Sequence, residues 1–145
     1  MTKKPFNKSK WTKIFIVLVV LGIVLGGCYF EAKRFWTPTI LEKTTFSQEE
    51  QDTILDYLGI ESNEAKVEKL LYTHARESVF TIFVTGLDDE ALKPFHLSLS
   101  TENLWHERSE INGREITSFF DEVEGRRTTL FKVNAFDEAL YDIVK

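Results

Sequence analysis

The chain has 145 residues, which is enough for one compact domain and a membrane anchor but too short for two domains. It carries a formal charge of −5, and the charges are unevenly distributed. The first 28 residues contain five lysines and no acidic residue, so residues 29–145 hold 13 Lys+Arg against 23 Asp+Glu, a formal charge of −10. A body this acidic repels phosphate groups, which argues against a nucleic-acid partner.

An apolar run lies near the N-terminus. Residues 14–25, IFIVLVVLGIVL, contain eleven large apolar side chains and one glycine. At roughly −0.3 to −0.6 kcal/mol per such residue, the run contributes about −3 to −7 kcal/mol to membrane insertion. Five lysines precede it and only Lys33 and Arg34 follow it closely, so the positive-inside rule keeps residues 1–13 in the cytoplasm and places the body outside.

The apolar segment, residues 14–30, allows two interpretations. In the first it is an uncleaved transmembrane helix, whose 17 residues would span about 25 Å of a hydrocarbon core of ~30 Å. Trp11 would then lie at the inner interface, and Tyr29, Phe30, Phe35 and Trp36 would form an outer aromatic belt.

The second interpretation is a cleaved export signal. The residues Leu25-Gly26-Gly27-Cys28 resemble the lipobox of bacterial lipoproteins, in which small residues precede a cysteine. This resemblance implies lipidation of the Cys28 sulfur, cleavage before it, and an anchor made of acyl chains. It covers residues 1–28 and implies nothing about the remaining chain. Because Cys28 is the only cysteine, an internal disulfide is excluded.

We expect a linker over residues 31–46, because Thr37-Pro38 breaks a helix leaving the membrane. The body then occupies residues 47–145. Its first element is a helix over residues 48–58, predicted by the capping-box pattern of Ser47 and Glu50 and by the stop at Gly59.

The rest of the body alternates between strand and helix patterns. Residues 64–75 fit either type, whereas 78–85, 95–100 and 128–134 favour strands. A helix is predicted between Asn112 and Gly125, and a last helix is predicted after Asn134 and Asp137. This last helix is expected to bury Phe136, Leu140, Ile143 and Val144. These elements predict an α+β domain with helices packed on a small, mainly antiparallel sheet.

No motif in the sequence carries recognisable chemistry. His74, His96 and His106 lack a metal-ligand spacing, and the Asp88-Asp89-Glu90 run lacks the other ligands of a calcium loop. No serine lies in a G-x-S-x-G elbow, and no glycine-rich phosphate loop is present. We therefore assign no catalytic residue, metal or cofactor.

Three residues of the body are candidates for an interface. Trp105 lies in the polar stretch NLWHERSE and is a candidate contact residue. Arg126 and Arg127 are adjacent cations in an acidic domain, and they fit either the dipole of the helix expected before Gly125 or a contact with an acidic partner or with lipid headgroups. The aromatic residues expected to form the core are Phe80, Phe83, Trp105, Phe119, Phe120, Phe131 and Phe136.

These features predict a membrane-anchored, extracytoplasmic module of a bacterial cell envelope that binds another envelope or secreted protein without catalysis. Two alternatives remain open. One is a small envelope hydrolase using carboxylates or a histidine, which a deep pocket at His96 or His106 would favour. The other is a module that captures a small ligand or peptide in a groove between sheet and helix, lined by aromatic side chains.

Overall fold

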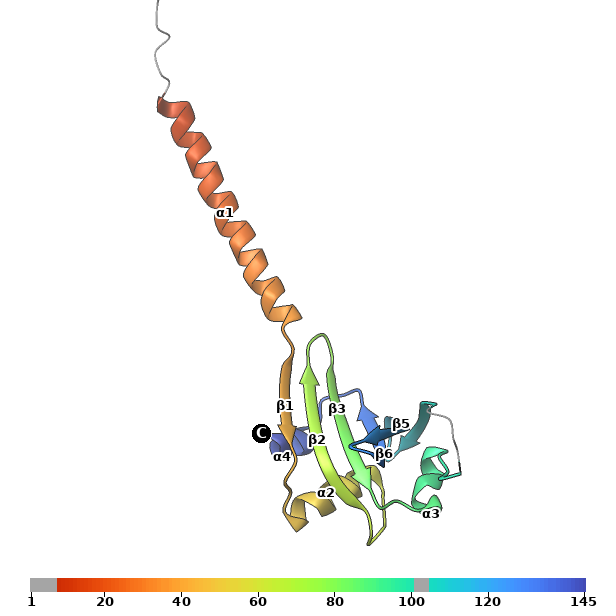
Figure 1. Ribbon diagram of the computed structural model, residues 1–145. Coiled ribbons are helices and arrows are strands. Elements are labelled where there is room, and N and C mark those ends of the chain that lie inside the picture. The colour runs from red at the N-terminus through yellow and green to blue at the C-terminus, as the bar shows by residue number, and fades with distance from the viewer. Residues whose placement is uncertain (1–7, 101–104) are drawn as a thin grey trace, which may run out of the picture. The chain divides into compact units, whose positions relative to one another are not determined.

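The computed structural model describes residues 8–100 and 105–145, and the chain divides into two units, Met1–Thr37 and Pro38–Lys145 (Figure 1). The first unit contains α1 (Lys8–Trp36), a helix of 29 residues. In the described part of the chain, this is the one helix long and apolar enough to cross a membrane. The helix ends just before Thr37-Pro38, where the sequence predicts a break, but it includes residues 31–36, which were expected to belong to the linker.

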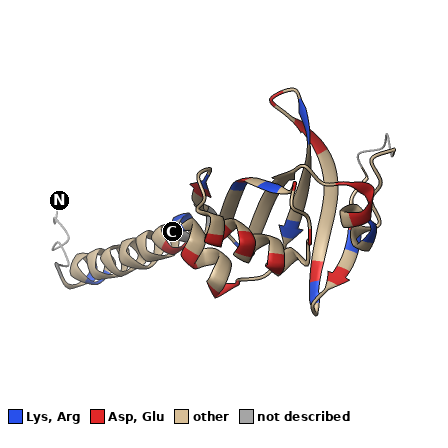
Figure 2. Cartoon of the chain, turned by 90° about the horizontal axis from the view of Figure 1, so that it is seen from below, with Lys and Arg blue, Asp and Glu red and all other residues tan. Residues whose placement is uncertain are grey.

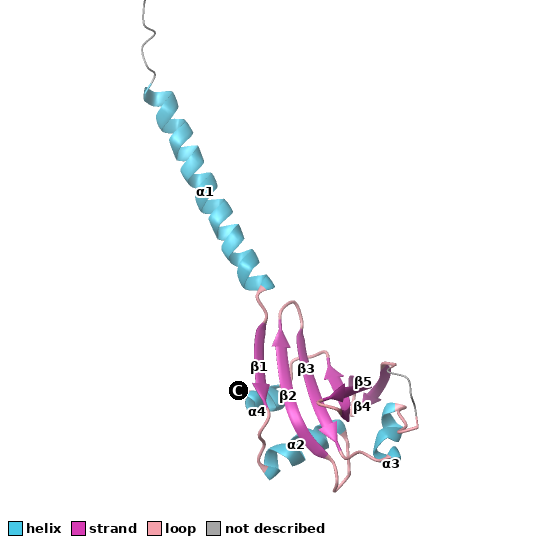
Figure 3. Cartoon of the chain, viewed as in Figure 1, coloured by secondary structure: helices cyan, strands magenta, loops and turns pink. Residues whose placement is uncertain are grey.

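The second unit consists of short helices and a single sheet (Figure 3). In chain order its elements are β1 (Thr39–Lys43), α2 (Gln48–Leu58), β2 (Lys66–His74), β3 (Ser78–Thr85), α3 (Asp89–Leu92), the 3₁₀ helix η1 (Lys93–Phe95), β4 (Glu107–Ile111), β5 (Arg114–Val123), β6 (Arg126–Val133) and α4 (Glu138–Val144).

All neighbouring strands of the sheet are antiparallel, in the order β1-β2-β3-β6-β5-β4. The α+β class with an antiparallel sheet is therefore confirmed. Two meanders of three strands meet where β3 pairs with β6, from Phe80 opposite Val133 to Val84 opposite Thr129. β1 and β4 are the two edges of the sheet.

The helical segments cover one face of the sheet. Helices α2 and α4 pack on β2, and α4 also reaches β1. At the other end, Phe95 of η1 packs against Phe131 of β6, with the rings tilted and their centroids 4.6 Å apart. The core lies between these layers and includes Ile54, Leu58, Phe80 and Leu140, none of which has any exposed surface. Burial of each such side chain stabilises the fold by about 1.5–3 kcal/mol.

The helix over residues 48–58 is confirmed, together with its capping box. Glu50 N–H donates to Ser47 Oγ, and Ser47 N–H donates to Glu50 Oε2. Lys43 Nζ lies 2.6 Å from Glu50 Oε1, so this cap also joins α2 to β1. β1 itself is a correction, because residues 39–43 were expected to belong to a linker.

The prediction of a helix between Asn112 and Gly125 is wrong. Asn112 and Gly113 both have positive φ and form the two-residue turn of the β4–β5 hairpin, and Glu124 and Gly125 do the same between β5 and β6. The helical spacing of apolar residues misled because β5 is buried on both faces. Ile116 and Phe120 face the core, whereas Phe119 faces away from it.

The strand expected at residues 95–100 is also wrong. The segment begins in η1, and His96 has a left-handed backbone with φ 58°. After it, Ser98 Oγ and the Leu99 N–H both donate to Asp89 Oδ1, at 3.0 and 2.6 Å. Such local bonds to a side chain replace the bonds of a strand ladder.

The remaining predictions are mostly confirmed. Residues 78–85 form β3, the predicted strand at 128–134 is β6, and the ambiguous segment is strand β2. Asp137 caps α4 by accepting from the Ala139 N–H, and the helix buries Leu140 and Val144. Phe136 was expected in the core and is instead 56% exposed.

Two glycines with nearly equal φ allow a test of the close approach between Gly86 and the segment before β2. A Cβ on Gly86 would lie 2.1 Å from the Glu64 carbonyl oxygen, whereas a Cβ on Gly113 would meet nothing within 4 Å. Gly113→Ala is expected to cost about 1–2 kcal/mol of unfolding free energy, from the left-handed backbone alone. Gly86→Ala should cost clearly more, because the Glu64 backbone must move.

Denaturant unfolding of the two variants in detergent, followed by near-ultraviolet circular dichroism, measures this difference. Equal losses in the two variants would contradict the proposed contact.

Candidate functional site

The face of the sheet opposite the helices, here called the open face, has an apolar band of its own. Phe83, Leu130 and Phe119 lie side by side on β3, β6 and β5 in one row of the register. Leu130 and Phe119 are only 5% and 9% exposed, yet they do not belong to the core beneath the helices. The open face therefore holds a second apolar cluster, which we call the aromatic band.

Cationic side chains and an imidazole cover this aromatic band. Lys69 Nζ lies 5.4 Å from the centroid of the Phe83 ring, and Lys132 Nζ lies 5.0 Å from that of Phe119. The His106 ring stacks on Phe119 with the centroids 4.2 Å apart. Attraction between a cation and the face of an aromatic ring is worth about 0.5–1 kcal/mol at exposed sites, so these groups are held over the band.

Charge is divided between the two layers of the domain. Helices α2, α3 and α4 contain Asp and Glu but no Lys or Arg, as the red segments of the helices in Figure 2 show. On the open face, the central strands β3 and β6 carry Lys132 and Arg126 and no carboxylate. An acidic helix layer thus backs a sheet whose open face is cationic at its centre.

The residues predicted for an interface do not form one site. Trp105, just before β4, is 69% exposed, the largest fraction for an apolar side chain in the described part of the second unit. Arg126 is exposed and lines a depression of the open face together with Phe83 and Lys69. The side chains of Glu42, Glu68 and Glu124 line the same depression. Cys28 is exposed within α1.

Arg127 has a structural contact that the sequence did not indicate. Its guanidinium lies 3.9 Å from the centroid of the Phe120 ring, and its Nη1 donates to the Leu99 carbonyl oxygen at 2.7 Å. The helix-dipole interpretation is wrong for both arginines, because the residues before them form a strand and a turn. Arg127 instead fastens the segment after η1 to the sheet.

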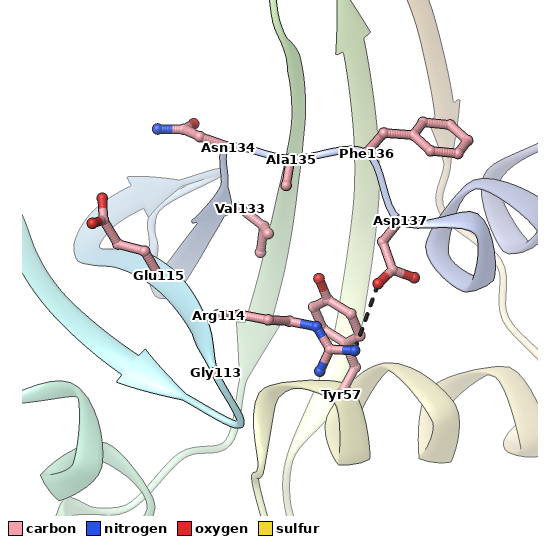
Figure 4. Close-up of a pocket in the computed structure, with 9 residues that line it drawn as sticks. All are labelled: Tyr57, Gly113, Arg114, Glu115, Val133, Asn134, Ala135, Phe136 and Asp137. Atoms are coloured by element: carbon pink, nitrogen blue, oxygen red, sulfur yellow. Dashed lines mark ion pairs between the residues drawn. The ribbon is translucent and has the colours of Figure 1, made fainter.

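A polar pocket of about 440 Å³ lies between α2, α4 and the β4–β5 hairpin (Figure 4). The Arg114 guanidinium lies 4.1 Å from the centroid of the Tyr57 ring, and its Nη2 is 3.6 Å from Asp137 Oδ2. Because Asp137 also caps α4, this cluster connects β5, α2 and α4. The exposed Phe136 lies at its margin.

Titration of Tyr57 reports on this cluster. Burial of the phenol raises its pKa above the ordinary value, the neighbouring Asp137 carboxylate raises the pKa further, and the Arg114 guanidinium partly opposes the shift. The phenol is therefore neutral at physiological pH and available as a hydrogen-bond donor.

The three histidines lie in three separate places on the domain. His74 Nδ1 is 3.0 Å from Ser78 Oγ at the β2–β3 turn, and His106 is stacked on Phe119. His96 lines a wide, shallow groove at the β4 edge with Ser109 and Glu110. Among the described residues, no group of three His, Cys, Asp or Glu side chains is placed to hold a metal ion.

The aromatic band and its covering cations were missed in the sequence. The signal that could have found them is the pair of short turns, Asn112-Gly113 and Glu124-Gly125, which are typical of hairpins. Once β5 and β6 are taken as strands, Phe119, Leu130 and Lys132 fall on one face by simple alternation.

Comparison of the chain with protein-family models, with curated proteins and with solved structures finds no match.

The raised pKa of Tyr57 predicts how stability depends on alkaline pH. A tyrosine whose pKa is raised by folding gives stability that is fully present below the unfolded pKa of about 10 and is lost as pH rises through the folded pKa. Absorbance of tyrosinate should show that one of the four tyrosines titrates above the others.

In Tyr57→Phe this late titration should disappear, and the alkaline loss of stability should be smaller than in the unmodified chain. Identical alkaline unfolding profiles for the two chains would contradict the placement of the Tyr57 phenol in a buried position beside the Asp137 carboxylate.

Proposed function

We propose that the chain is a membrane-anchored module of a bacterial cell envelope that binds another protein outside the cytoplasm, without catalysis. The anchor is α1, kept as an uncleaved helix with residues 1–13 in the cytoplasm. The lysines before the apolar run and the scarcity of cations after it support this orientation. The bulky Tyr29 and Phe30 continue the apolar run past Cys28, which favours a helix that is not cut at Cys28.

The connection between the two units limits where a partner can be. Only Thr37 and Pro38 separate the end of α1 from the start of β1. Two residues reach about 7 Å when fully extended, so the domain works within a short distance of its anchor. The partner is therefore a protein in the membrane or one that comes close to its surface.

The single observation that carries the proposal is the aromatic band beneath its covering cations. The apolar side chains of the band lie outside the core and are covered by lysine side chains, so a partner that displaces these lysines would gain apolar contacts there. Lys132 and Arg126 complement a partner surface that is acidic. Lys69 Nζ lies 3.2 Å from Glu42 Oε1, so this lysine would exchange its ion pair with Glu42 for one with the partner. The acidic helix layer of the same domain would repel such a partner, which directs binding to the open face.

The form of the anchor can be tested by the mass of the mature protein from membranes. We expect the full-length mass, and Cys28→Ala should change it only by the lost sulfur atom. Both chains should stay in the membrane fraction. A product that begins at residue 28 and carries acyl groups, lost in Cys28→Ala, would instead establish the lipoprotein interpretation.

The open face can be tested by photocrosslinking in cells. A photoreactive residue at position 126 should give one specific protein adduct. The Lys69→Glu/Lys132→Glu double substitution should lower its yield about tenfold, because it reverses two charges that face the acidic partner. Lys93→Glu/Lys145→Glu, at two exposed positions away from the open face, is the matched control with the same change of net charge, and it should leave the adduct unchanged.

A double substitution that leaves the yield unchanged, in a chain that keeps its circular dichroism spectrum, would refute the assignment of the open face. Failure to recover any specific protein would refute the binding function itself.

A second candidate is the capture of a small ligand or peptide in the Tyr57–Arg114–Asp137 pocket. Its volume of about 440 Å³ lies in the range of ligand sites, and Phe136 points outward at its margin. If this pocket carried the function, Arg114→Met would abolish the binding of the small ligand or peptide, whereas Lys69→Glu/Lys132→Glu would leave that binding intact.

A further inference from the structure

From the free edge of β4 we infer that two copies of this chain pair with each other, antiparallel and edge to edge, around Ser109. β4 ends the sheet that the described residues form, so among them no strand lies beside the outer side of β4, whose backbone groups face outward. A groove of about 500 Å³ runs along it, lined by Arg108, Ser109, Glu110 and Gly113. The types and the order of the residues in this groove indicate that the strand which pairs with β4 belongs to a second copy of this chain.

The β4 sequence is complementary to itself in charge. In an antiparallel pair centred on Ser109, Arg108 of one copy lies opposite Glu110 of the other, and Glu110 lies opposite Arg108 of the other. Both contacts therefore join opposite charges, and opposite-charge cross-strand pairs each contribute roughly 0.2–1 kcal/mol to sheet pairing. A twofold axis through Ser109 makes the two contacts equivalent, as in a closed dimer.

The backbone pattern allows this register. Ile111 and Arg114 flank the two-residue turn and close the β4–β5 hairpin. Because hydrogen-bonded and non-hydrogen-bonded pairs alternate along an antiparallel ladder, Arg108 and Glu110 direct their N–H and C=O groups toward the free edge. These are the two residues that face each other in the dimer, so each pair can also exchange backbone hydrogen bonds.

Ser109 supplies an independent observation. Its residue is 7% exposed, and among the described residues its Oγ is the buried side-chain atom that has no hydrogen-bond partner. A buried hydroxyl without a partner costs about 1–3 kcal/mol. In the inferred dimer the two Ser109 residues occupy a non-hydrogen-bonded pair, where side chains approach most closely, and the two hydroxyls can bond to each other.

Two further features of the monomer agree with this pairing. Within one copy, Glu110 lies directly opposite Glu115 on β5, and like charges in this position destabilise a sheet. Arg108 of the second copy would come beside Glu110 and offset that repulsion. The same register brings the exposed Trp105 opposite Gly113 of the second copy, where the space above the backbone is open.

The other edge of the sheet lacks this complementarity. Pairing β1 with itself around Leu41 would bring Ile40 opposite Glu42 and Thr39 opposite Lys43, so no opposite charges would meet. A five-residue edge gives a small interface, which alone is weak. Anchoring both copies in one membrane raises their effective concentration and favours the dimer.

A disulfide tests the register. In a Cys28→Ala background, Ser109→Cys would bring two Cα atoms about 4.5 Å apart, within the range of a disulfide. Purified full-length chain in lipid vesicles, with mild oxidant, should form linked dimer at least about fivefold more than the control Ile40→Cys, whose side chain is exposed on β1. Linkage no greater than in this control would overturn the inference.

Charge exchange tests the same pairing without a new cysteine. Arg108→Glu or Glu110→Arg alone would bring like charges together twice, and each should lower the dimer fraction about tenfold in chemical crosslinking of the purified chain in lipid vesicles. The double variant Arg108→Glu/Glu110→Arg restores opposite charges and should restore the dimer. A double variant as monomeric as the single ones would overturn the inference. Since only the purified chain is present, these outcomes are independent of whether the open face binds another protein.

Discussion

The second unit depends on the pairing of β3 with β6. These strands are 41 residues apart between Thr85 and Arg126, and their pairing joins a local β1-β2-β3 meander to a local β4-β5-β6 meander. Without it each meander would be a separate three-stranded sheet, the smallest size that can be stable by itself, and the core that spans both meanders would be divided. Phe80 opposite Val133 and Ile82 opposite Phe131 build the core on one face of this seam, and Phe83 beside Leu130 starts the aromatic band on the other.

The two faces of the paired strands β3 and β6 are covered by different groups. On the core face, α2, α4 and η1 supply apolar side chains and exclude water. On the open face no helix is present among the described residues, so long cationic side chains cover the rings with their methylene stems and keep their charges in water. This arrangement stabilises the isolated domain and leaves a surface that a protein partner can cover by displacing flexible lysines.

The division of charge follows from the same architecture. The helices expose one face each, and that face is filled with carboxylates, several of which lie in first turns where the helix dipole favours them. The cations lie mainly on the strands, where they pair with carboxylates or stack on rings. The domain is thus acidic as a whole, yet its open face and its β4 edge present arginine and lysine in defined positions. These positions suit binding to an acidic protein and to a second copy, on different surfaces.

Strictly local features of the sequence determined α1, α2 and β3. A run of large apolar residues, a Ser47–Glu50 capping box and a β-branched, aromatic segment each specify their own structure, because the interactions involved lie within a few residues. The sequence also contained the Asn112-Gly113 turn signal, but a competing helical spacing in β5 concealed it, since residues buried on both faces of a strand lose the simple alternation.

Only the tertiary structure decided which residues share a surface. Arg126 and Arg127 are neighbours in the chain but face opposite sides of β6, because successive side chains of a strand alternate. Phe119, Leu130 and Phe83 come from three strands and meet only through sheet register. The edge position of β4 likewise depends on long-range pairing, so the self-complementary order Arg108-Ser109-Glu110 has no meaning until the sheet leaves that strand uncovered.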